Sequence, residues 1–383
     1  MDIFDETRQS ALVTNKIKWA MKSKVHKIYP WNGPIKYFIP NSFKHSFAGI
    51  ENAIYEIQNH TCIRFERQMN VITNGPGINF EKGLYCQNKK IGEKQFNTSQ
   101  KIILTNNCAT KKVIVQGFLH EALGQLSPVL RHDRDLYVKM NLDNMVPQFR
   151  DIFKQKFLPI LNYTGTYDYE SITHYSPMYF SINKIRKTII PIGRYKKYLE
   201  NMISRIDEAS FNDYKLLNKY YCQNSCKQNL EKKCKNSGYQ DPTNCKICVC
   251  PRGLTAPDCS VINYNFNVKC GHLKIYPSNH LKHFVKSDVS YCLYHLSVPF
   301  GKHIFIRFPG FKGIFRKKEC SLKNSIEVKY KGLGEPGICL CYNENFGDPE
   351  IVSEGNVMLV IYNFAYYETY VHFEYMMLEK NRL

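Results

Sequence analysis

The feature that most constrains this 383-residue sequence is the uneven distribution of its 15 cysteines. Three lie before residue 110, and the other twelve lie between Cys222 and Cys341. Residues 222–259 are turn-rich and dense in cysteine, and a segment of about forty residues rarely folds without covalent cross-links. The clustering therefore predicts disulfide-bonded modules and an oxidising compartment. Because the count is odd, we expect at least one thiol to be free or to pair between chains.

Other features of the sequence bear on its location. N-glycosylation sequons begin at Asn59, Asn97 and Asn162, as is typical of secreted proteins. Residues 1–28 contain no apolar leader, so we expect the sequence to start downstream of a signal peptide. No run of about eighteen apolar residues occurs, and no transmembrane segment is predicted. A secreted, extracellular protein is expected.

The formal net charge is +20 at pH 7. Such an excess of basic side chains favours binding to acidic polymers, and for an exported chain the candidate is a heparan-type polyanion. The alternative is that the lysines only keep the surface solvated. Nucleic acid is not expected as a partner of an exported chain.

Residues 29–222 mix strand and helix patterns. Strands are predicted at 35–40, 62–67 and 100–108, and apolar residues at helical spacing predict a helix at 46–61. The stretch 111–124, "KKVIVQGFLHEALG", has the length of a helix, and Gly124 suits its C-terminal end. A helical span without cysteines is expected from there to Tyr221.

Residues 261–383 alternate between apolar and polar side chains, for example in "HIFIRF", "SIEVKY", "NVMLVIYNF" and "YVHFEYMM". This period of two predicts a β-sandwich. The expected organisation is an α+β protein with four parts: an N-terminal segment at 1–28, a mixed domain at 29–222, a small disulfide-rich module at 223–260 and a sandwich at 261–383.

The pair His120-Glu121 begins like a zinc-peptidase helix, in which a second histidine four residues later shares the face of the first. That position holds Gly124. A catalytic zinc needs three protein ligands and an open position for water, so the pair does not make a zinc site by itself.

The residues around this pair resemble the astacin family of zinc metallopeptidases. Ala122-Leu123-Gly124, followed by Arg131 and by residues 133–138, is similar to the family segment after the second zinc histidine. "YPWNGPIKYFI", "HTCIRF", "YDYESITHYSPMYFS" and "SFNDYKLLNKYYC" resemble other family motifs in the same order. The resemblance implies a metzincin-like, two-lobed peptidase domain over residues 29–222.

Counted back from Gly124, the resemblance places the family's zinc ligands on residues that bind zinc poorly. The three histidine positions are Gly117, Glu121 and Ser127, and the catalytic glutamate position is Phe118. A phenyl ring cannot accept a proton from water, and a serine hydroxyl is a poor zinc ligand. Zinc is thus implied by the family but is not expected to be bound.

Other family positions in and around the site have also changed. Pro128 stands where the family has the glutamate that pairs with the freed N-terminus, and Thr173 replaces the methionine of the Met-turn. Tyr175 occupies the place of the zinc-proximal tyrosine. His120 is rotated by about 100° from the family's ligand face. We therefore expect His120, His132 and His174 to be ordinary packed or surface histidines.

The C-terminal modules resemble those that follow the peptidase domain in nematode astacins. Residues 223–260 resemble an EGF-like module, for which a small zinc knuckle is a less favoured alternative, and residues 261–383 resemble a CUB domain. A second CUB disulfide would join Cys320 to Cys339 or Cys341. The resemblance implies these disulfides: Cys62–Cys222, Cys86–Cys108, Cys226–Cys245, Cys234–Cys248, Cys250–Cys259 and Cys270–Cys292.

Three functions are compatible with these observations. The first is a secreted pseudoprotease that binds a peptide or an extracellular-matrix protein without cutting it. The second is an active zinc metalloendopeptidase with an altered site. The third is an adhesion protein that binds polyanions.

Overall fold

The structure is a computed structural model that describes residues 31–88, 98–154, 165–203, 207–226, 233–264, 268–287, 291–309, 324–340, 347–364 and 370–379. The chain divides into two compact units, residues 1–196 with 206–227 and residues 197–205 with 228–383. The predicted segment 1–28 and the sequons at Asn97 and Asn162 lie outside the described residues. No helix among the described residues is long and apolar enough to cross a membrane.

The first unit contains a five-stranded sheet with the order β2-β1-β3-β5-β4. Neighbouring strands are parallel, except that β4 runs antiparallel to β5 at one edge. The predicted strands at 35–40, 62–67 and 100–108 correspond to β1, β2 and β5, whereas β3 was not predicted. The strands are β1 (Ile35–Phe38), β2 (Phe65–Gln68), β3 (Ile78–Lys82), β4 (Gln87–Asn88) and β5 (Gln100–Leu104).

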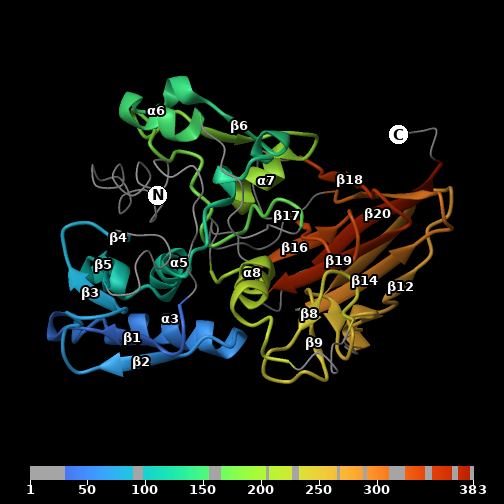
Figure 1. The fold of residues 1–383 in the computed structure, drawn as a ribbon. Helices are drawn as coiled ribbons and strands as arrows, with labels where there is room; N and C mark the ends of the chain where they lie inside the picture. The colour runs from blue at the N-terminus through green and yellow to red at the C-terminus, as the bar shows by residue number, and fades with distance from the viewer. Residues whose placement is uncertain are drawn as a thin grey trace. The chain divides into compact units, whose positions relative to one another are not determined.

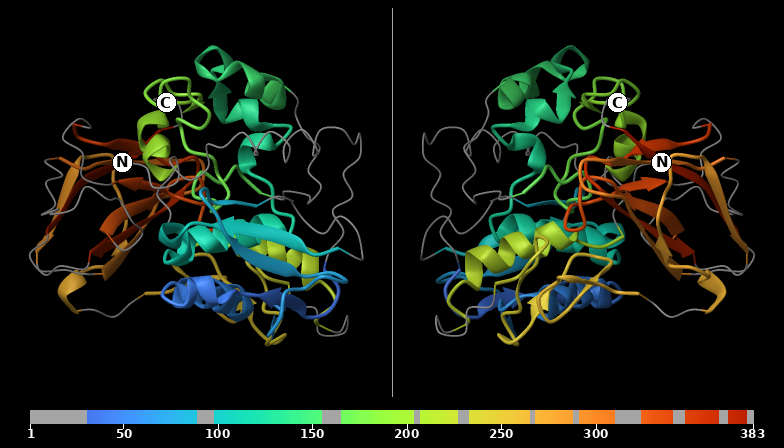
Figure 2. Two further views of the ribbon diagram at one scale, coloured as in Figure 1. Left: turned by 90° about the vertical axis from the view of Figure 1, so that its left-hand side faces the viewer. Right: turned by 90° about the vertical axis from the view of Figure 1, so that its right-hand side faces the viewer.

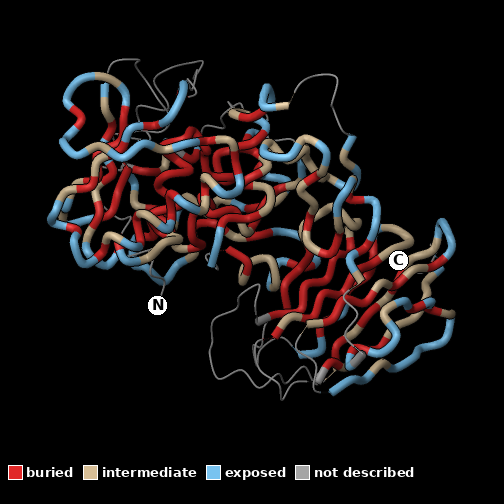
Figure 3. Tube along the Cα trace, turned by 90° about the horizontal axis from the view of Figure 1, so that it is seen from below, coloured by how far each residue is buried: buried red, intermediate tan, exposed pale blue. Residues whose placement is uncertain are grey.

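Helices α3 (Phe47–His60) and α5 (Lys112–Ala122) share one hydrophobic core with this sheet. Both helices were predicted. Gly49 of α3 lies so close to α4 (Asn106–Ala109) that a Cβ atom there would collide with the carbonyl oxygen of Ala109. On α5 every residue from Ile114 to Ala122 is buried. A helix that is buried on all sides lies inside a domain. Figure 3 shows the buried residues of the chain in red.

The segment from Gly124 to Tyr221 is less helical than predicted. It contains single 3-10 turns, a two-stranded antiparallel sheet and three short helices. A proline begins the 3-10 turn at Pro128, and another begins helix α6. Side chains hold turns after residue 165; for example, Thr188 Oγ1 donates to the carbonyl oxygen of Tyr179 at 2.7 Å. The elements are η2 (Pro128–Leu130), η3 (Arg134–Leu136), β6 (Val138–Met140), η4 (Leu142–Asn144), α6 (Pro147–Lys154), β7 (Ile189–Pro191), α7 (Lys196–Met202) and α8 (Phe211–Tyr221).

The first unit has the expected two-lobed form. Figures 1 and 2 show the five-stranded sheet with α3 and α5 in one lobe, and α6 with β6 in the other. The disulfides Cys62–Cys222 and Cys86–Cys108 are both present, as the resemblance implied. The first of them ties the start of the β2 segment to the residue that caps α8.

The disulfide-rich part of the second unit contains the short antiparallel pairs β8–β9 and β10–β11. The disulfides Cys234–Cys248 and Cys250–Cys259 are present as expected, and Cys226 and Cys245 are each disulfide-bonded. These cross-links take the place of a large core. The strands are β8 (Tyr239–Gln240), β9 (Cys248–Val249), β10 (Leu254–Thr255) and β11 (Val261–Ile262).

The rest of the second unit is the predicted β-sandwich. One sheet has the order β12-β14-β19-β16-β17 and the other β13-β20-β15-β18. The ring of Tyr294 in the first sheet meets Phe284 and Phe373 of the second in edge-on contacts. The strands are β12 (Lys274–Ile275), β13 (Lys282–Ser287), β14 (Tyr291–Ser297), β15 (His303–Arg307), β16 (Asn324–Lys329), β17 (Ile338–Leu340), β18 (Glu350–Val352), β19 (Val357–Phe364) and β20 (Tyr370–Leu378).

Within the sandwich, the expected disulfide Cys270–Cys292 is present. Cys339 is buried on β17, while Cys320 and Cys341 lie outside the described residues. The second disulfide of this region therefore stays a prediction.

Candidate metal centre

The end of α5 fixes the register of the candidate site. Gly124 has a φ of +97°, in the left-handed region that favours glycine. Its N–H donates to the carbonyl of Glu121 at 2.9 Å, and the N–H of Gln125 donates to the carbonyl of His120 at 2.9 Å. These two bonds form the Schellman motif that commonly ends helices at glycine. The predicted helix stop at Gly124 is confirmed.

The positions where the resemblance places zinc ligands are all buried. Gly117, Phe118 and Glu121 lie on α5, and Ser127 precedes η2. Phe118 is 2% exposed and belongs to the hydrophobic core between α3, α5 and the sheet. Among the described residues, the Oγ atom of Ser127 finds no hydrogen-bond partner.

This set of side chains does not fit a zinc ion. Gly117 contributes no donor, Ser127 contributes a weak one, and only Glu121 carries a carboxylate. Within the described residues of the first unit, no three His, Cys, Asp or Glu side chains bring ligand atoms close enough to share a cation. Phe118 also leaves the position of the general base without a proton acceptor.

His120 faces the protein core and not a cleft. It is fully buried, its Nδ1 donates to Oε1 of Gln125 at 2.9 Å, and its Nε2 has no partner among the described residues. Burial lowers the pKa of His120, although the Asp213 carboxylate and the Gln125 hydrogen bond oppose this shift. The imidazole is therefore held neutral inside the domain.

Gln125 connects His120 to a buried carboxylate that the sequence analysis missed. The Nε2 atom of Gln125 donates to Oδ1 of Asp213, which also accepts from Ser171 Oγ at 2.6 Å. The other carboxylate oxygen accepts from the N–H groups of Ile172 at 2.7 Å and of residue 210 at 2.9 Å. The network joins the end of α5, the turn near residue 172 and the start of α8.

The sequence contained one local signal for this network. Ser210 and Asp213 form a capping box at the start of α8, in which each side chain bonds the other residue's N–H. A serine followed three residues later by an acidic residue before a helix is the known pattern of such a cap.

A second buried carboxyl, that of Asp168, adjoins the same network. Ser210 Oγ donates to its Oδ2 at 2.6 Å. Burial, and after it the negative charge of Asp213, raises the pKa of Asp168 to about 7. A pocket opens beside these groups and is lined by Gln125, Pro128, Arg131, Asp168, Asp213 and Lys219, among others.

The segment that resembles the Met-turn is held by hydrogen bonds. Thr173 is fully buried, and its Oγ1 donates to the carbonyl of Leu126 at 3.2 Å. Tyr175 is also buried, with its ring stacked on Tyr179 at 4.2 Å and edge-on to Phe153 at 6.2 Å. The tyrosine that the family places near zinc thus belongs to an aromatic cluster.

The remaining candidate histidines do not form a metal site. His174 is buried, donates from Nδ1 to the carbonyl of Tyr175 at 2.7 Å and accepts at Nε2 from Tyr167 Oη at 2.8 Å. Desolvation lowers the pKa of His174 to about 4. His132 is exposed. Among the described residues, the ligand atoms of His120, His132 and His174 do not come together as one group.

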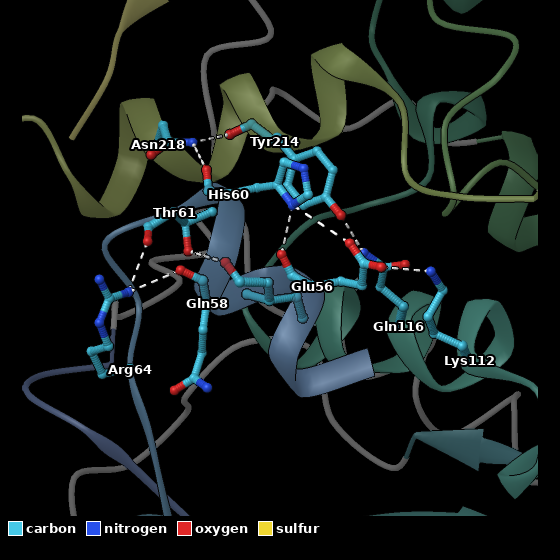
Figure 4. A network of polar contacts seen from close by, with 10 residues as sticks. Glu56, Gln58, His60, Thr61, Arg64, Lys112, Gln116, Tyr214 and Asn218 are labelled. Carbon is cyan, nitrogen blue, oxygen red and sulfur yellow. Dashed lines mark hydrogen bonds and ion pairs between the residues drawn. The ribbon is translucent and has the colours of Figure 1, made fainter. Parts of the chain in front are cut away.

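Polar contacts also tie the first half of α5 to α3 and α8 (Figure 4). Lys112 Nζ lies 2.6 Å from Glu56 Oε1, and Gln116 Nε2 donates to Tyr214 Oη at 2.6 Å. The ring of His60 stacks on Tyr214 at 4.3 Å. Next to His60, the sequon residue Asn59 is exposed on the last turn of α3, and its glycosylation stays a prediction.

The two-lobed α+β unit, its central helix and its two disulfides agree with the peptidase fold that the resemblance implied. The family model described as "Astacin", a peptidase family, matches residues 23–222. The chain belongs to the astacin family.

Two nematode zinc metalloproteinases resemble the chain over different lengths. The zinc metalloproteinase nas-26 of Caenorhabditis elegans is 28% identical over an alignment of 379 residues, and the match covers 91% of this chain and 85% of that protein. The zinc metalloproteinase nas-36 of Haemonchus contortus is 31% identical over 244 residues, 63% of this chain and 38% of that protein. The chain therefore corresponds to less than half the length of the second relative.

Among solved structures, the high choriolytic enzyme 1 of the medaka fish Oryzias latipes, a hatching enzyme zinc-protease, is 28% identical. The match covers 51% of this chain and 94% of that chain, with a TM-score of 0.44.

Proposed function

We propose that this chain is a secreted, catalytically inactive astacin-family protein that binds a peptide or an extracellular-matrix protein without cleaving it. The observation that carries the proposal is the register set by Gly124, which puts Gly117, Phe118 and Glu121 on α5 where the family has its first ligand, base and second ligand. No zinc-bound water can form where two of the three ligand positions lack a strong donor.

The burial of Phe118 supports the loss of the general base. Its ring packs in the core, so the side chain does not line a site where water could be activated. His120 does not compensate, because its imidazole is buried and bonded to Gln125. The three described disulfide-bonded regions support an oxidising, extracellular location.

A hydrolysis assay tests the inactivity. The full chain, refolded or secreted with its disulfides and loaded with zinc, is incubated with casein and with a quenched fluorescent peptide library, with and without 1,10-phenanthroline. We expect no hydrolysis that the chelator suppresses. Chelator-sensitive hydrolysis that is lost in Glu121→Ala would establish the active zinc metalloendopeptidase instead.

The pocket beside Asp168 supports the proposed binding of a peptide. It is lined by the basic side chains of Lys215 and Lys219 beside the carboxyl of Asp168, so it can contact charged groups of a chain. We expect Lys219→Glu to change the set of peptides that the protein retains from a peptide library. Identical retention by the variant and the native protein would remove this pocket from the proposal.

The net charge of +20 supports a second candidate function, the binding of a heparan-type polyanion. Lys282 and Lys286 are exposed on β13 of the sandwich. We expect the protein to stay on heparin above about 0.15 M salt and the double variant Lys282→Glu/Lys286→Glu to elute earlier. Elution of the native protein below that salt concentration would contradict this function.

A further inference from the structure

We propose a transition-metal site on the outer face of the β-sandwich, formed by His283, His372 and Glu374. Their ligand atoms all lie within 4.8 Å of one another, and they form the only such group of three among the residues that the structure describes. The site belongs to the second unit and is independent of the proposed function of the first.

Strand pairing brings the three side chains together. His283 of β13 is the register partner of Glu374 on β20, and His372 lies two residues before Glu374 on the same strand. Residues two apart on a strand point to the same face of the sheet. The residue between them, Phe373, is fully buried and packs against Tyr294 of the other sheet, so His372 and Glu374 point away from the sandwich core.

The geometry within the group suits a shared cation. Nδ1 of His283 lies 3.4 Å from Oε1 of Glu374, and the rings of His283 and His372 lie 6.1 Å apart. The side chain of His283 is 60% exposed, whereas that of Glu374 is 8% exposed. A cation can reach the group from solvent, while the carboxylate is held at its base by the sheet.

The chemistry of the three donors points to zinc or a similar transition metal. Two imidazole nitrogens and one carboxylate oxygen form a ligand set that zinc uses, and imidazole favours Zn²⁺, Cu²⁺ and Ni²⁺ over Ca²⁺ or Mg²⁺. The remaining coordination positions would face solvent, which supplies water.

Arg307 supports the carboxylate from the opposite side. It is the register partner of Glu374 on β15, and its Nε donates to Oε2 at 2.7 Å, with a further contact from Nη2 to the same oxygen. Oε1 therefore remains directed at His283. A bonded carboxylate is held in one orientation, as is typical behind metal ligands. The guanidinium charge opposes a nearby cation, so we expect weaker binding than at a structural zinc site.

The site affects how zinc measurements on this protein are interpreted. With a second site in the sandwich, zinc found in the purified chain is by itself no evidence of a peptidase centre. Variants of each location are therefore needed to assign any bound metal.

Isothermal titration of the metal-stripped full chain with ZnCl₂ tests the site. We expect one equivalent bound by the native protein, at least tenfold weaker binding by His283→Ala/His372→Ala, and native binding by His280→Ala, whose exposed imidazole lies outside the group. Zinc should also raise the melting temperature of the native protein and not that of the double variant, provided both show the same circular dichroism.

Other outcomes would overturn the site. Absence of stoichiometric zinc uptake by the native protein, or equal affinity in the native protein and the double variant, contradicts it. Uptake that persists in the double variant and disappears in Glu121→Ala would place the metal at α5 and would contradict the proposed inactivity as well. Loss of zinc binding at the sandwich alone leaves the proposed function of the first unit unchanged.

Discussion

The Nδ1 atom of His120 lies 2.9 Å from the Oε1 atom of Gln125, and the backbone N–H of Gln125 donates to the carbonyl of His120 at the same distance. His120, which begins the zinc-peptidase-like pair, is thus hydrogen-bonded to Gln125 just beyond the end of α5. Because Gln125 in turn bonds Asp213, the imidazole is part of a buried structural network. These bonds hold the end of α5 to the start of α8 in the interior of the first unit.

Phe118 is expected to behave as a core residue. Phe118→Ala should lower the free energy of unfolding by roughly 3–5 kcal/mol, because it removes a buried ring and leaves a cavity. Chemical denaturation monitored by circular dichroism measures this loss. Tyr55, whose side chain is 61% exposed on α3, is the matched control, and Tyr55→Ala should change stability by less than about 0.5 kcal/mol. Equal effects of the two substitutions would show that position 118 is not packed as described.

Asp213 is expected to be the most sensitive polar residue of the first unit. Asp213→Ala leaves the donors of Gln125, Ser171 and the start of α8 buried without an acceptor, which should cost roughly 3 kcal/mol or more. Asp151 is the control, because it lies on the surface of α6 beside Lys154. Asp151→Ala should leave the free energy of unfolding nearly unchanged, since solvent screens such a pair. A small loss at both positions in urea unfolding would contradict the network.

The buried carboxyl of Asp168 predicts a pH dependence of stability. Its pKa is raised to about 7 in the folded protein from an ordinary value of 3.8, so the folded state binds more protons between about pH 4 and pH 7. The contribution of Asp168 to the free energy of unfolding therefore falls as pH rises through this window, by roughly 1.4 kcal/mol for each pH unit.

Comparison with Asp168→Asn isolates this contribution. The native protein should lose stability relative to the variant as pH rises from about 4 to about 7. His174, whose pKa is lowered to about 4, has the opposite dependence, since its contribution is lost as pH falls below about 6.5. It is present in both proteins and cancels in the difference. A difference that is independent of pH would show that the carboxyl titrates normally.

The disulfide Cys62–Cys222 is expected to contribute more than Cys86–Cys108, because its cysteines are 160 residues apart and those of the second disulfide only 22. The chain-entropy estimate for replacing each pair by serines is a loss of roughly 5 and 3 kcal/mol, respectively. Thermal unfolding of the two double variants measures the order. A larger loss for Cys86–Cys108 would contradict the entropic account.

The helices and strands that local pattern specifies could be predicted from the sequence. Apolar spacing indicated α3, and the length of the stretch 111–124 indicated α5. Gly124 marked the end of α5 because glycine readily takes its backbone conformation. The alternation after residue 300 likewise predicted β15, β16, β19 and β20. The helical span expected after Gly124 was wrong, because prolines and side-chain hydrogen bonds there stabilise turns.

The buried network could not be predicted, since it depends on tertiary contacts. The network contains direct hydrogen bonds between Gln125, Ser171 and Asp213, and the bonded residues are 42 to 88 positions apart in the sequence. No helix or strand periodicity relates residues at such separations. The cross-strand group at His283, His372 and Glu374 was missed for the same reason, because the register between β13 and β20 brings it together. Within the network, only the capping box of Ser210 and Asp213 corresponds to a local sequence pattern.

On the proposed function, the positions on α5 do not hold a catalytic zinc. Anomalous diffraction at the zinc edge, from crystals of the full chain grown with ZnCl₂, tests it most directly. We predict no anomalous peak within coordination distance of Glu121 or Ser127. A peak in contact with Glu121, with imidazole or carboxylate groups completing its coordination, would contradict the account.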